Sequence, residues 1–244
     1  NDWDYSWNFG DDSYGGGDED EHTYTDYGVY QICLTTTNPW GVTCSETTCE
    51  YFTLGTPGCN DTLATNYNPN ADFNNGSCIY QGTQAIPLPA GWSIFSTFIE
   101  PTVNNIDSVF KEIVGNTVLV KNQIGLVYYP QYSITLLDTL ALGQGYQVKM
   151  ASGDTLNVTG IICQPSNSPI SLAAGWSIIG YLRQTPENIS QIFSAIVSNT
   201  EIVKDELGNI FWPQYSINNI GNMLPGKGYQ VKMINSDVLV YLGN

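Results

Sequence analysis

The chain has 244 residues, of which 42% are hydrophobic and only 12% are charged, and its formal net charge at pH 7 is −16. Such a charge repels nucleic-acid phosphates and anionic lipid headgroups, so it excludes these as partners and leaves divalent cations as candidates. No apolar run reaches the roughly 20 residues of a membrane-spanning helix, and no signal peptide is visible at Asn1, so we interpret the chain as a mature or truncated piece of a longer protein.

The six cysteines lie at irregular spacings without any CxxC pair. They are Cys33, Cys44, Cys49, Cys59, Cys78 and Cys163. In an acidic chain with a single histidine and many Asn and Thr residues, this pattern favours disulfides in an oxidising compartment over a zinc site. We therefore expect a secreted or cell-surface protein.

Residues 1–54 contain WNFGDDS, an acidic glycine-rich loop, and then HTYTDYGVY. They resemble the polycystic-kidney-disease (PKD) domain, with its W-x-F-G-D-G, H-x-Y, G-x-Y-x-V and N-x-x-G elements. The matching positions are Trp7, Phe9, Gly10, Asp11, His22, Tyr24, Gly28, Tyr30, Asn38 and Gly41. The resemblance implies an immunoglobulin-like β-sandwich that serves as a spacer or a protein–carbohydrate contact module, with a structural role for His22. Asp12 replaces the second glycine and the family's first strands are missing, so we expect a partial sandwich.

Two cysteines of this segment, Cys33 and Cys49, lie roughly opposite each other across a hairpin that turns at residues 38–41, and we expect them to pair. Cys44 and Cys163 are then either free or a link between the first domain and the rest. Sequence spacing does not choose among these connectivities.

Residues 55–82 form a separate insert. Its sequence GCNDTLATNYNPNADFNNGSCIY (58–80) resembles a short cysteine-bracketed element of secreted proteins from marine and gliding Bacteroidota. The resemblance implies a Cys59–Cys78 disulfide, and closing a loop of about 20 residues contributes about 3 kcal/mol through the unfolded state. An element this short needs such a link because it has no core of its own.

Oxygen-bearing side chains alternate through the insert ahead of Gly76. They are Asn66, Asn68, Asn70, Asp72 and Asn74. Because calcium prefers oxygen ligands, they form a candidate calcium site that resembles an EF-hand loop only loosely, with the glycine one place late and no closing glutamate. The alternative is an Asn-rich turn whose side chains cap the backbone.

The rest of the chain is a duplication, with one module at 83–165 and a second at 166–244. IPLPAGWSI at 86–94 recurs as ISLAAGWSI at 170–178, and from residue 105 to 150 the offset is a constant 83 residues with 22 of 46 positions identical. The modules resemble GWN-L-I-S … G-x-G-Y-W-V-K repeats of large bacterial surface and secreted proteins. That resemblance implies a location and a modular architecture, not an activity.

Each module is expected to hold one short helix packed on a small sheet. Apolar residues recur at helical spacing before Gly115, which is placed to end the helix. The stripe is Ile106, Val109, Phe110, Ile113 and Val114 in the first copy, and Ile189, Ile192, Phe193, Ile196 and Val197 in the second. Thr185–Pro186 is expected to start the second helix. The strands predicted in the first copy are 92–98, 117–121, 126–129, 146–150 and 156–162.

The sequence contains few residues that could together form a catalytic site. His22 is the only histidine, which excludes Ser–His and Cys–His nucleophile systems from residues 23–244. The aligned modules share one carboxylate, Asp154 with Asp237, whereas glycoside hydrolysis needs a pair. We therefore predict no enzyme activity and no catalytic residue.

A glycan site is the main binding hypothesis for the modules. Its candidate residues are Tyr128, Tyr132, Phe211, Trp212 and Tyr215, and alternation places Tyr128 and Tyr132 on one face. The alternative is that these aromatics pack in the core. We assign Trp92 and Trp176 to the core. The repeated lysines Lys121/Lys204 and Lys149/Lys232 are interpreted as solvent-facing strand positions, the alternative being ion pairs with a neighbouring module.

Four tripeptides match the D-[S/T]-aliphatic acceptor pattern of Bacteroidota O-glycosylation. The acceptor residues are Thr62, Ser108, Thr139 and Thr155.

The sequence thus predicts a mainly β, multidomain chain with a partial immunoglobulin-like sandwich and two tandem α+β or sandwich-like modules. We expect a stalk, surface fibre or adhesin segment that contacts neighbouring domains of its own polypeptide. The alternative is a carbohydrate-binding or accessory region of a secreted polysaccharide-degrading enzyme. A third hypothesis is self-association into filaments through edge strands.

Overall fold

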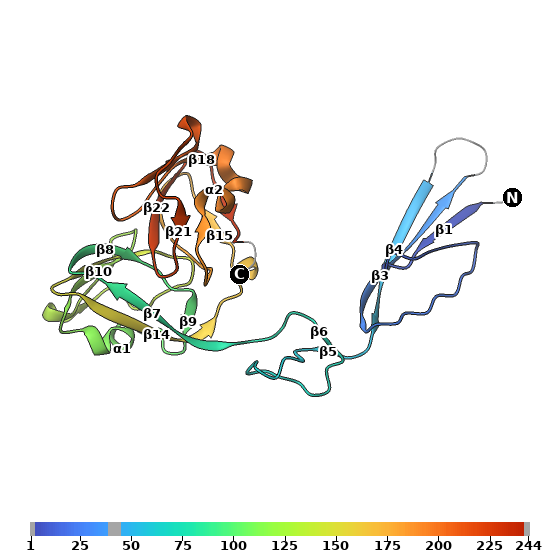
Figure 1. Ribbon diagram of the computed structural model, residues 1–244, viewed down its shortest axis with the longest axis horizontal. Helices are drawn as coiled ribbons and strands as arrows, with labels where there is room; N and C mark the ends of the chain where they lie inside the picture. The colour runs from blue at the N-terminus through green and yellow to red at the C-terminus, as the bar shows by residue number, and fades with distance from the viewer. Residues whose placement is uncertain (1–2, 39–44, 242–244) are drawn as a thin grey trace. The chain divides into compact units, whose positions relative to one another are not determined.

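The computed structural model describes residues 3–38 and 45–241, and the chain forms two compact units, Asn1–Tyr80 and Gln81–Asn244. Strands dominate both units, and the helices are short (Figure 1), which confirms the predicted mainly β class. None of the described helices has the length and apolar character needed to cross a bilayer.

The first unit begins with one antiparallel sheet in the order β2-β1-β3-β4. Its strands are β1 (Asp4–Asn8), β2 (Tyr14–Gly16), β3 (Gly28–Thr37) and β4 (Ser45–Leu54). In the described part of residues 1–54 this sheet is a single layer, as a partial sandwich requires. Cys33 of β3 lies directly opposite Cys49 of β4, and the two form a disulfide with a Cα–Cα distance of 4.1 Å. The expected turn at 38–41 lies largely outside the described residues, as does Cys44.

The insert holds one short parallel pair, β5 (Pro57–Gly58) with β6 (Phe73–Asn74). Cys59 and Cys78 form the predicted disulfide, and both are buried with Ala64 in a small cluster against Tyr80. The Tyr80 hydroxyl donates to the Asp61 carboxylate at 2.7 Å. A disulfide and a few side chains therefore replace a core in this element.

The first repeat packs a five-stranded antiparallel sheet, in the order β12-β11-β10-β13-β8, with a three-stranded sheet, β7-β14-β9. Its elements are β7 (Gln81–Leu88), β8 (Gly91–Phe95), β9 (Ile99–Pro101), α1 (Ile106–Val109), β10 (Thr117–Lys121), β11 (Val127–Tyr129), β12 (Ile134–Thr135), β13 (Tyr146–Met150) and β14 (Asp154–Ile162). Its core contains Phe95, Phe110, Tyr128 and Val148, with side chains from both sheets and the helix.

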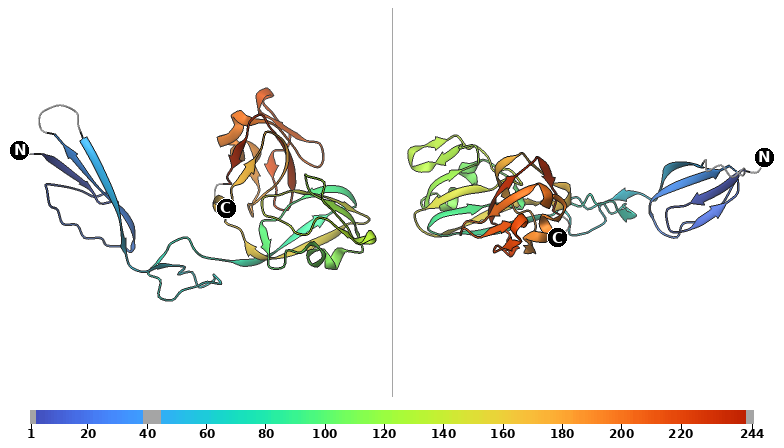
Figure 2. Two further views of the ribbon diagram at one scale, coloured as in Figure 1. Left: turned by 180° about the vertical axis from the view of Figure 1, so that it is seen from behind. Right: turned by 90° about the horizontal axis from the view of Figure 1, so that it is seen from above.

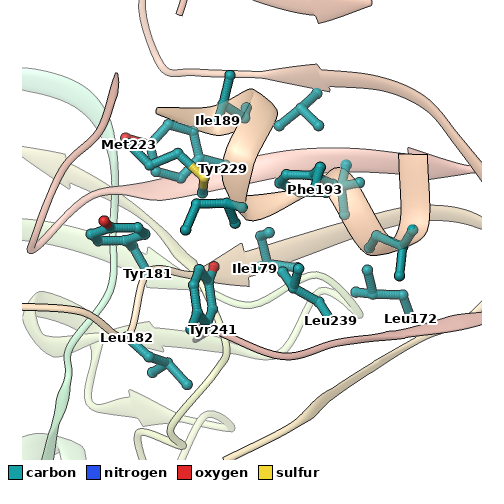
Figure 3. Packing of buried hydrophobic residues seen from close by; sticks show 14 of the residues in the cluster. Leu172, Ile179, Tyr181, Leu182, Ile189, Phe193, Met223, Tyr229, Leu239 and Tyr241 are labelled. Atoms are coloured by element: carbon teal, nitrogen blue, oxygen red, sulfur yellow. The ribbon is translucent and has the colours of Figure 1, made fainter. Parts of the chain in front are cut away.

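The second repeat follows the same plan, with a five-stranded sheet in the order β16-β22-β18-β19-β20. Its elements are β15 (Ile170–Leu172), β16 (Gly175–Gly180), β17 (Glu187–Asn188), α2 (Ile189–Ile192), β18 (Thr200–Lys204), β19 (Ile210–Trp212), β20 (Ile217–Asn218), β21 (Asn222–Met223), β22 (Gly228–Met233) and β23 (Asp237–Leu239). Figure 3 shows Ile189 and Phe193 at the α2 end of this core, with Tyr229 and Met223 beside them.

The helix stripe is buried in both copies except at its last position and at Val109, which is half-buried. Ile106, Phe110 and Ile113 are buried, whereas Val114 and its counterpart Val197 are exposed because the chain leaves the α-helix after one turn and continues as a 3₁₀ helix. Thr185–Pro186 does not start the second helix. Asn188 caps it, its side chain accepting a bond from the Ser190 amide, and Asn105 caps the first helix through the Ser108 amide.

The two repeats are joined through the ends of β8 and β16, which are edge strands of the two large sheets. Figure 2 shows the ribbon of the two repeats from two further sides. Phe95 forms an antiparallel bridge with Lys227, and Ile179 forms one with Gln144. Phe95 and Ile179 are equivalent in the duplication, as are Gln144 and Lys227, so the bridges are related by a pseudo-twofold axis.

Further hydrogen bonds repeat the same symmetry. The Ser96 amide donates to the Gly226 carbonyl at 3.0 Å, and the equivalent Gly180 amide donates to the Gly143 carbonyl at 2.8 Å. The Ile94 amide donates to Glu206 Oε2 at 2.9 Å, as the Ile178 amide does to Gln123 Oε1 at 2.9 Å.

The Ser96 hydroxyl also links the repeats. It donates to the Lys227 carbonyl at 2.6 Å and accepts from the Tyr181 amide at 3.0 Å. The repeats therefore have two core clusters, with Phe98 packed against both, and they share a hydrogen-bonded seam. We call this seam the repeat interface: Ile94–Ser96, Gly143–Gly145, Ile178–Tyr181 and Gly226–Gly228.

Gly145 tests the repeat interface because its neighbours leave no room for a side chain. A Cβ there would meet the Ile179 carbonyl oxygen at 2.6 Å, whereas a Cβ at Gly115 would meet nothing within 4 Å, and neither glycine has a positive φ. We expect Gly145→Ala to lower the free energy of unfolding of the repeats by about 1–3 kcal/mol. Gly115→Ala should be neutral or stabilising by about 0.5 kcal/mol. Urea unfolding of both variants measures this, and equal midpoints would contradict the interface.

Candidate functional site

The five aromatics predicted to bind glycans are not brought together on one surface. Tyr128 and Phe211 are 1% and 5% exposed and belong to the two repeat cores, so they are unavailable to a ligand. Alternation fails as a guide here because Pro130–Tyr132 and Pro213–Tyr215 are 3₁₀ turns that end with Ser133 and Ser216 in the left-handed region.

The remaining three lie around these turns. Tyr132 and Tyr215 are exposed, and Trp212 is half-buried. Tyr132 packs edge-on against Tyr129 with ring centroids 4.5 Å apart, and Tyr215 packs likewise against Trp212 at 4.7 Å. Glycan binding by these aromatic pairs stays a prediction.

The assignment of Trp92 and Trp176 to the core was wrong. They are 52% and 53% exposed, because β8 and β16 turn Phe95 and Ile179 inward and so place the tryptophans on the outer face of each sheet. Trp92 lies opposite Lys149 in the strand register, and Trp176 lies opposite Lys232.

Lysines pack against both tryptophans. Lys121 Nζ is 5.2 Å from the Trp92 ring centroid, and Lys149 Nζ is 5.9 Å from it. Lys204, the counterpart of Lys121, is 5.2 Å from the Trp176 ring. Three of the four repeated lysines therefore make cation–π contacts on the outer face of the sheets, and the fourth, Lys232, pairs with Glu201.

Each tryptophan lines a surface groove. The first has a volume of about 320 Å³ and includes Trp92, Lys121, Gln147 and Glu206. The second, of about 330 Å³, includes Trp176, Lys204, Gln123 and Gln230. Gln230 also lines the first groove, so the two adjoin. We call them the Trp92 groove and the Trp176 groove.

The charged side chains on and around the two grooves differ. Glu201 pairs with Lys232 at 2.9 Å in the second repeat, but the first repeat has Val118 at that position, so Lys149 has no such partner. Glu206 lines the Trp92 groove and pairs with Lys227, whereas its counterpart Gln123 in the Trp176 groove is neutral. The sequence signal for the grooves was the recurrence of Trp, Lys and Gln at matching strand positions.

Four of the five predicted calcium ligands accept hydrogen bonds from backbone amides. The Asn66, Asn68 and Asn74 side-chain oxygens accept from the Ile79, Asn70 and Gly76 amides, and Asp72 accepts from the Thr56 amide. These contacts are those of the alternative, a turn capped by its own side chains. Calcium binding at Asn66, Asn68, Asn70, Asp72 and Asn74 stays a prediction.

The candidate glycosylation residues Thr62, Ser108, Thr139 and Thr155 are all exposed. Exposure is necessary for modification but does not show it, so O-glycosylation stays a prediction.

His22 lies among residues of the first sheet. Its ring stacks on Phe9 with centroids 4.4 Å apart and packs edge-on against Tyr24 at 4.6 Å. Nε2 contacts Asp11 at 2.7 Å and the Ser13 hydroxyl at 3.2 Å, and that hydroxyl also donates to Asp11. A catalytic triad needs the acid and the nucleophile on opposite ring nitrogens, so this arrangement is that of a structural network.

The same network lowers the pKa of the Asp11 carboxyl group. Its hydrogen bonds from Ser13 and His22 lower its pKa below the ordinary value.

Cys163 is buried and unpaired, and its thiol contacts the Leu182 carbonyl at 3.4 Å. Burial raises the pKa of the Cys163 thiol to about 11, which suppresses thiolate chemistry at neutral pH.

The carboxylate that occurs at the same position of both modules, Asp154 or Asp237, accepts equivalent hydrogen bonds in each. Asp154 accepts from the Asn116 side chain at 2.8 Å and from the Thr155 amide, and Asp237 accepts from Asn199 at 2.8 Å and from the Val238 amide. These bonds lower the pKa of both aspartates. The residue therefore has a structural contact in each repeat.

Comparison with protein families gives a match for part of the chain. A family model described as PKD domain matches residues 1–53. Comparison with curated proteins and with solved structures gave no significant match. The family result agrees with the resemblance carried by Trp7, Phe9 and His22, and it covers the sheet of the first unit.

Asp154 and Asp237 occupy equivalent positions in the two repeats, so in a titration each aspartate serves as the control for the other. The folded-state pKa of each lies below the unfolded value, so their contribution to stability is present above that value and is lost as pH falls through the folded pKa. Asn116→Ala should raise the pKa of Asp154 toward its ordinary value and leave Asp237 unchanged, and Asn199→Ala should do the reverse. Carboxyl NMR titration checks both. Unshifted midpoints in the matched variants would contradict the assignment.

Proposed function

We propose that the chain is a non-catalytic structural and adhesive segment of a larger extracellular protein, acting as a stalk, surface fibre or adhesin spacer. The PKD match over residues 1–53 supports this, because that family is commonly structural or adhesive outside the cell. The disulfides Cys33–Cys49 and Cys59–Cys78 suit an oxidising compartment.

The repeat interface is the observation that carries the proposal. Two modules joined by a flexible linker would move independently, and interfaces between such domains are usually small and polar. Here the backbone amides of Ser96, Gly145 and Gly180 donate hydrogen bonds to carbonyl groups of the other repeat. A spacer built in this way holds the orientation of what it carries.

The titratable groups of the described residues also fit a structural role. Asp11, Asp61, Asp154 and Asp237 have lowered pKa values, each explained by local hydrogen bonds. Catalytic groups instead gather in a cleft with pKa values shifted for acid–base work.

The second candidate function is a carbohydrate-binding or accessory region of a secreted polysaccharide-degrading enzyme. The exposed aromatic pairs Tyr129/Tyr132 and Trp212/Tyr215 favour it, because amphipathic rings at a surface are typical of contact sites.

Replacement of both repeats by a flexible linker tests the structural role. In cells that make the native protein, residues 81–244 are replaced by a Gly/Ser linker of equal length, and a second strain carries Gly115→Ala as the conservative control. Antibodies to residues 81–244 should label intact native and control cells. The linker strain should lose adhesion under flow, because a flexible chain does not hold orientation. Unchanged adhesion with loss of a hydrolytic activity would contradict the proposal and favour the second candidate.

A further inference from the structure

The Trp92 and Trp176 grooves repeat one set of side chains on either side of the pseudo-twofold axis. Trp92, Lys121 and Gln147 of the first repeat correspond to Trp176, Lys204 and Gln230 of the second. In both repeats the lysine and the glutamine lie directly opposite each other in neighbouring strands. The two sites therefore have the same construction, although the charges at their rims differ.

Both tryptophans keep about half of their surface in solvent, at 52% and 53%. A lysine ammonium group lies near each ring and holds it against the sheet, with much of the ring left exposed. Tryptophan has a large apolar surface and is a frequent anchor of binding sites. Its exposure at the same strand position in both copies is not explained by packing.

The polar side chains beside the rings have unused hydrogen-bonding capacity. The side-chain amides of Gln147 and Gln230 donate and accept no hydrogen bond among the described residues, and Lys121 and Lys204 have no carboxylate partner there. An amide offers both donors and acceptors, and a lysine offers donors. A ligand rich in hydroxyl groups satisfies both kinds of side chain.

The surroundings argue against two other ligand classes. A polyanion would meet Asp205 and Glu206 at the Trp92 groove on a chain of net charge −16. A peptide added as an extra strand would need a free edge, but the Ile94 and Ile178 amides are already bonded to Glu206 and Gln123.

We propose that the two grooves are adjoining subsites for one extended, uncharged polysaccharide. The apolar face of one pyranose ring lies on Trp92 and that of another on Trp176, and hydroxyl groups between them bond to Gln147, Gln230 and the lysines. Gln230 lines both grooves, so one chain can occupy both without leaving the surface. This activity goes beyond the structural role and does not depend on it.

Affinity electrophoresis of the full chain tests the proposal, in gels that contain hydroxyethyl cellulose, xylan, laminarin or, as the acidic arm, alginate. At least one of the three neutral polymers should retard the chain. Trp92→Ala and Trp176→Ala should each weaken binding about tenfold or more, and the double variant should abolish it. Loss of one subsite should weaken binding of the polymer more than binding of a short oligosaccharide, because the polymer gains from joining two sites.

The matched control is Trp3→Ala, which removes an exposed tryptophan of the other unit and should bind as the unmodified chain does. Thermal unfolding of every variant checks the fold, and Trp92→Phe, which keeps an aromatic ring, should retain part of the affinity. No retardation by any neutral polymer overturns the proposal. Retardation by alginate alone that is lost in high salt, or a double variant that binds normally, overturns it as well.

Discussion

The contacts that the ends of β8 and β16 each make with the other repeat, through Lys227 and Gln144, are the constraint on which the duplicated unit depends. Each repeat buries its own aromatic core, yet the last residues of each GWSI strand are hydrogen-bonded to the other repeat through Ser96 and Gly180. Because the contact uses backbone groups on both sides, it requires close approach, which explains Gly145 and Gly228 at positions where a Cβ would collide with the partner repeat. The same contact fixes the outward tryptophans of the two repeats in adjoining grooves.

The two repeats differ in the charge of side chains at some equivalent positions. Gln123 and Glu206 accept equivalent amide bonds, but only Glu206 adds a charge, which Lys227 compensates. Val118 and Glu201 occupy the same bulge, and only the latter pairs with the neighbouring lysine. The interface contacts are thus kept while the electrostatics of the two grooves differ. This pattern is consistent with a fixed scaffold that presents two related but unequal surfaces.

Much of this architecture could be predicted from periodicity. Local spacing in the sequence predicted the strands 117–121 and 146–150, the burial of Phe110 in the helix stripe and the Cys33–Cys49 disulfide. The structure contains all of them. The candidate site was harder to predict. Trp92 lies in an apolar strand, so its residue type and neighbours predicted burial. Only the strand register of the structure, in which Trp92 lies opposite Lys149, places it on the outer face. The repeat interface has no sequence signal beyond paired glycines, since each of its bonds uses at least one backbone group and joins residues far apart in the chain.

Amide hydrogen exchange at the repeat interface tests the central claim most directly. The amides of Ser96, Gly145, Gly180 and Tyr181 all donate across the interface, and none of their bonds lies within a single repeat. If the repeats form one body, these amides exchange as slowly as Val148 and Val231 at the centres of the two sheets, because they open only with the whole unit. Exchange at the rate of open loops, with Val148 and Val231 still protected, would show two independent modules and contradict the account.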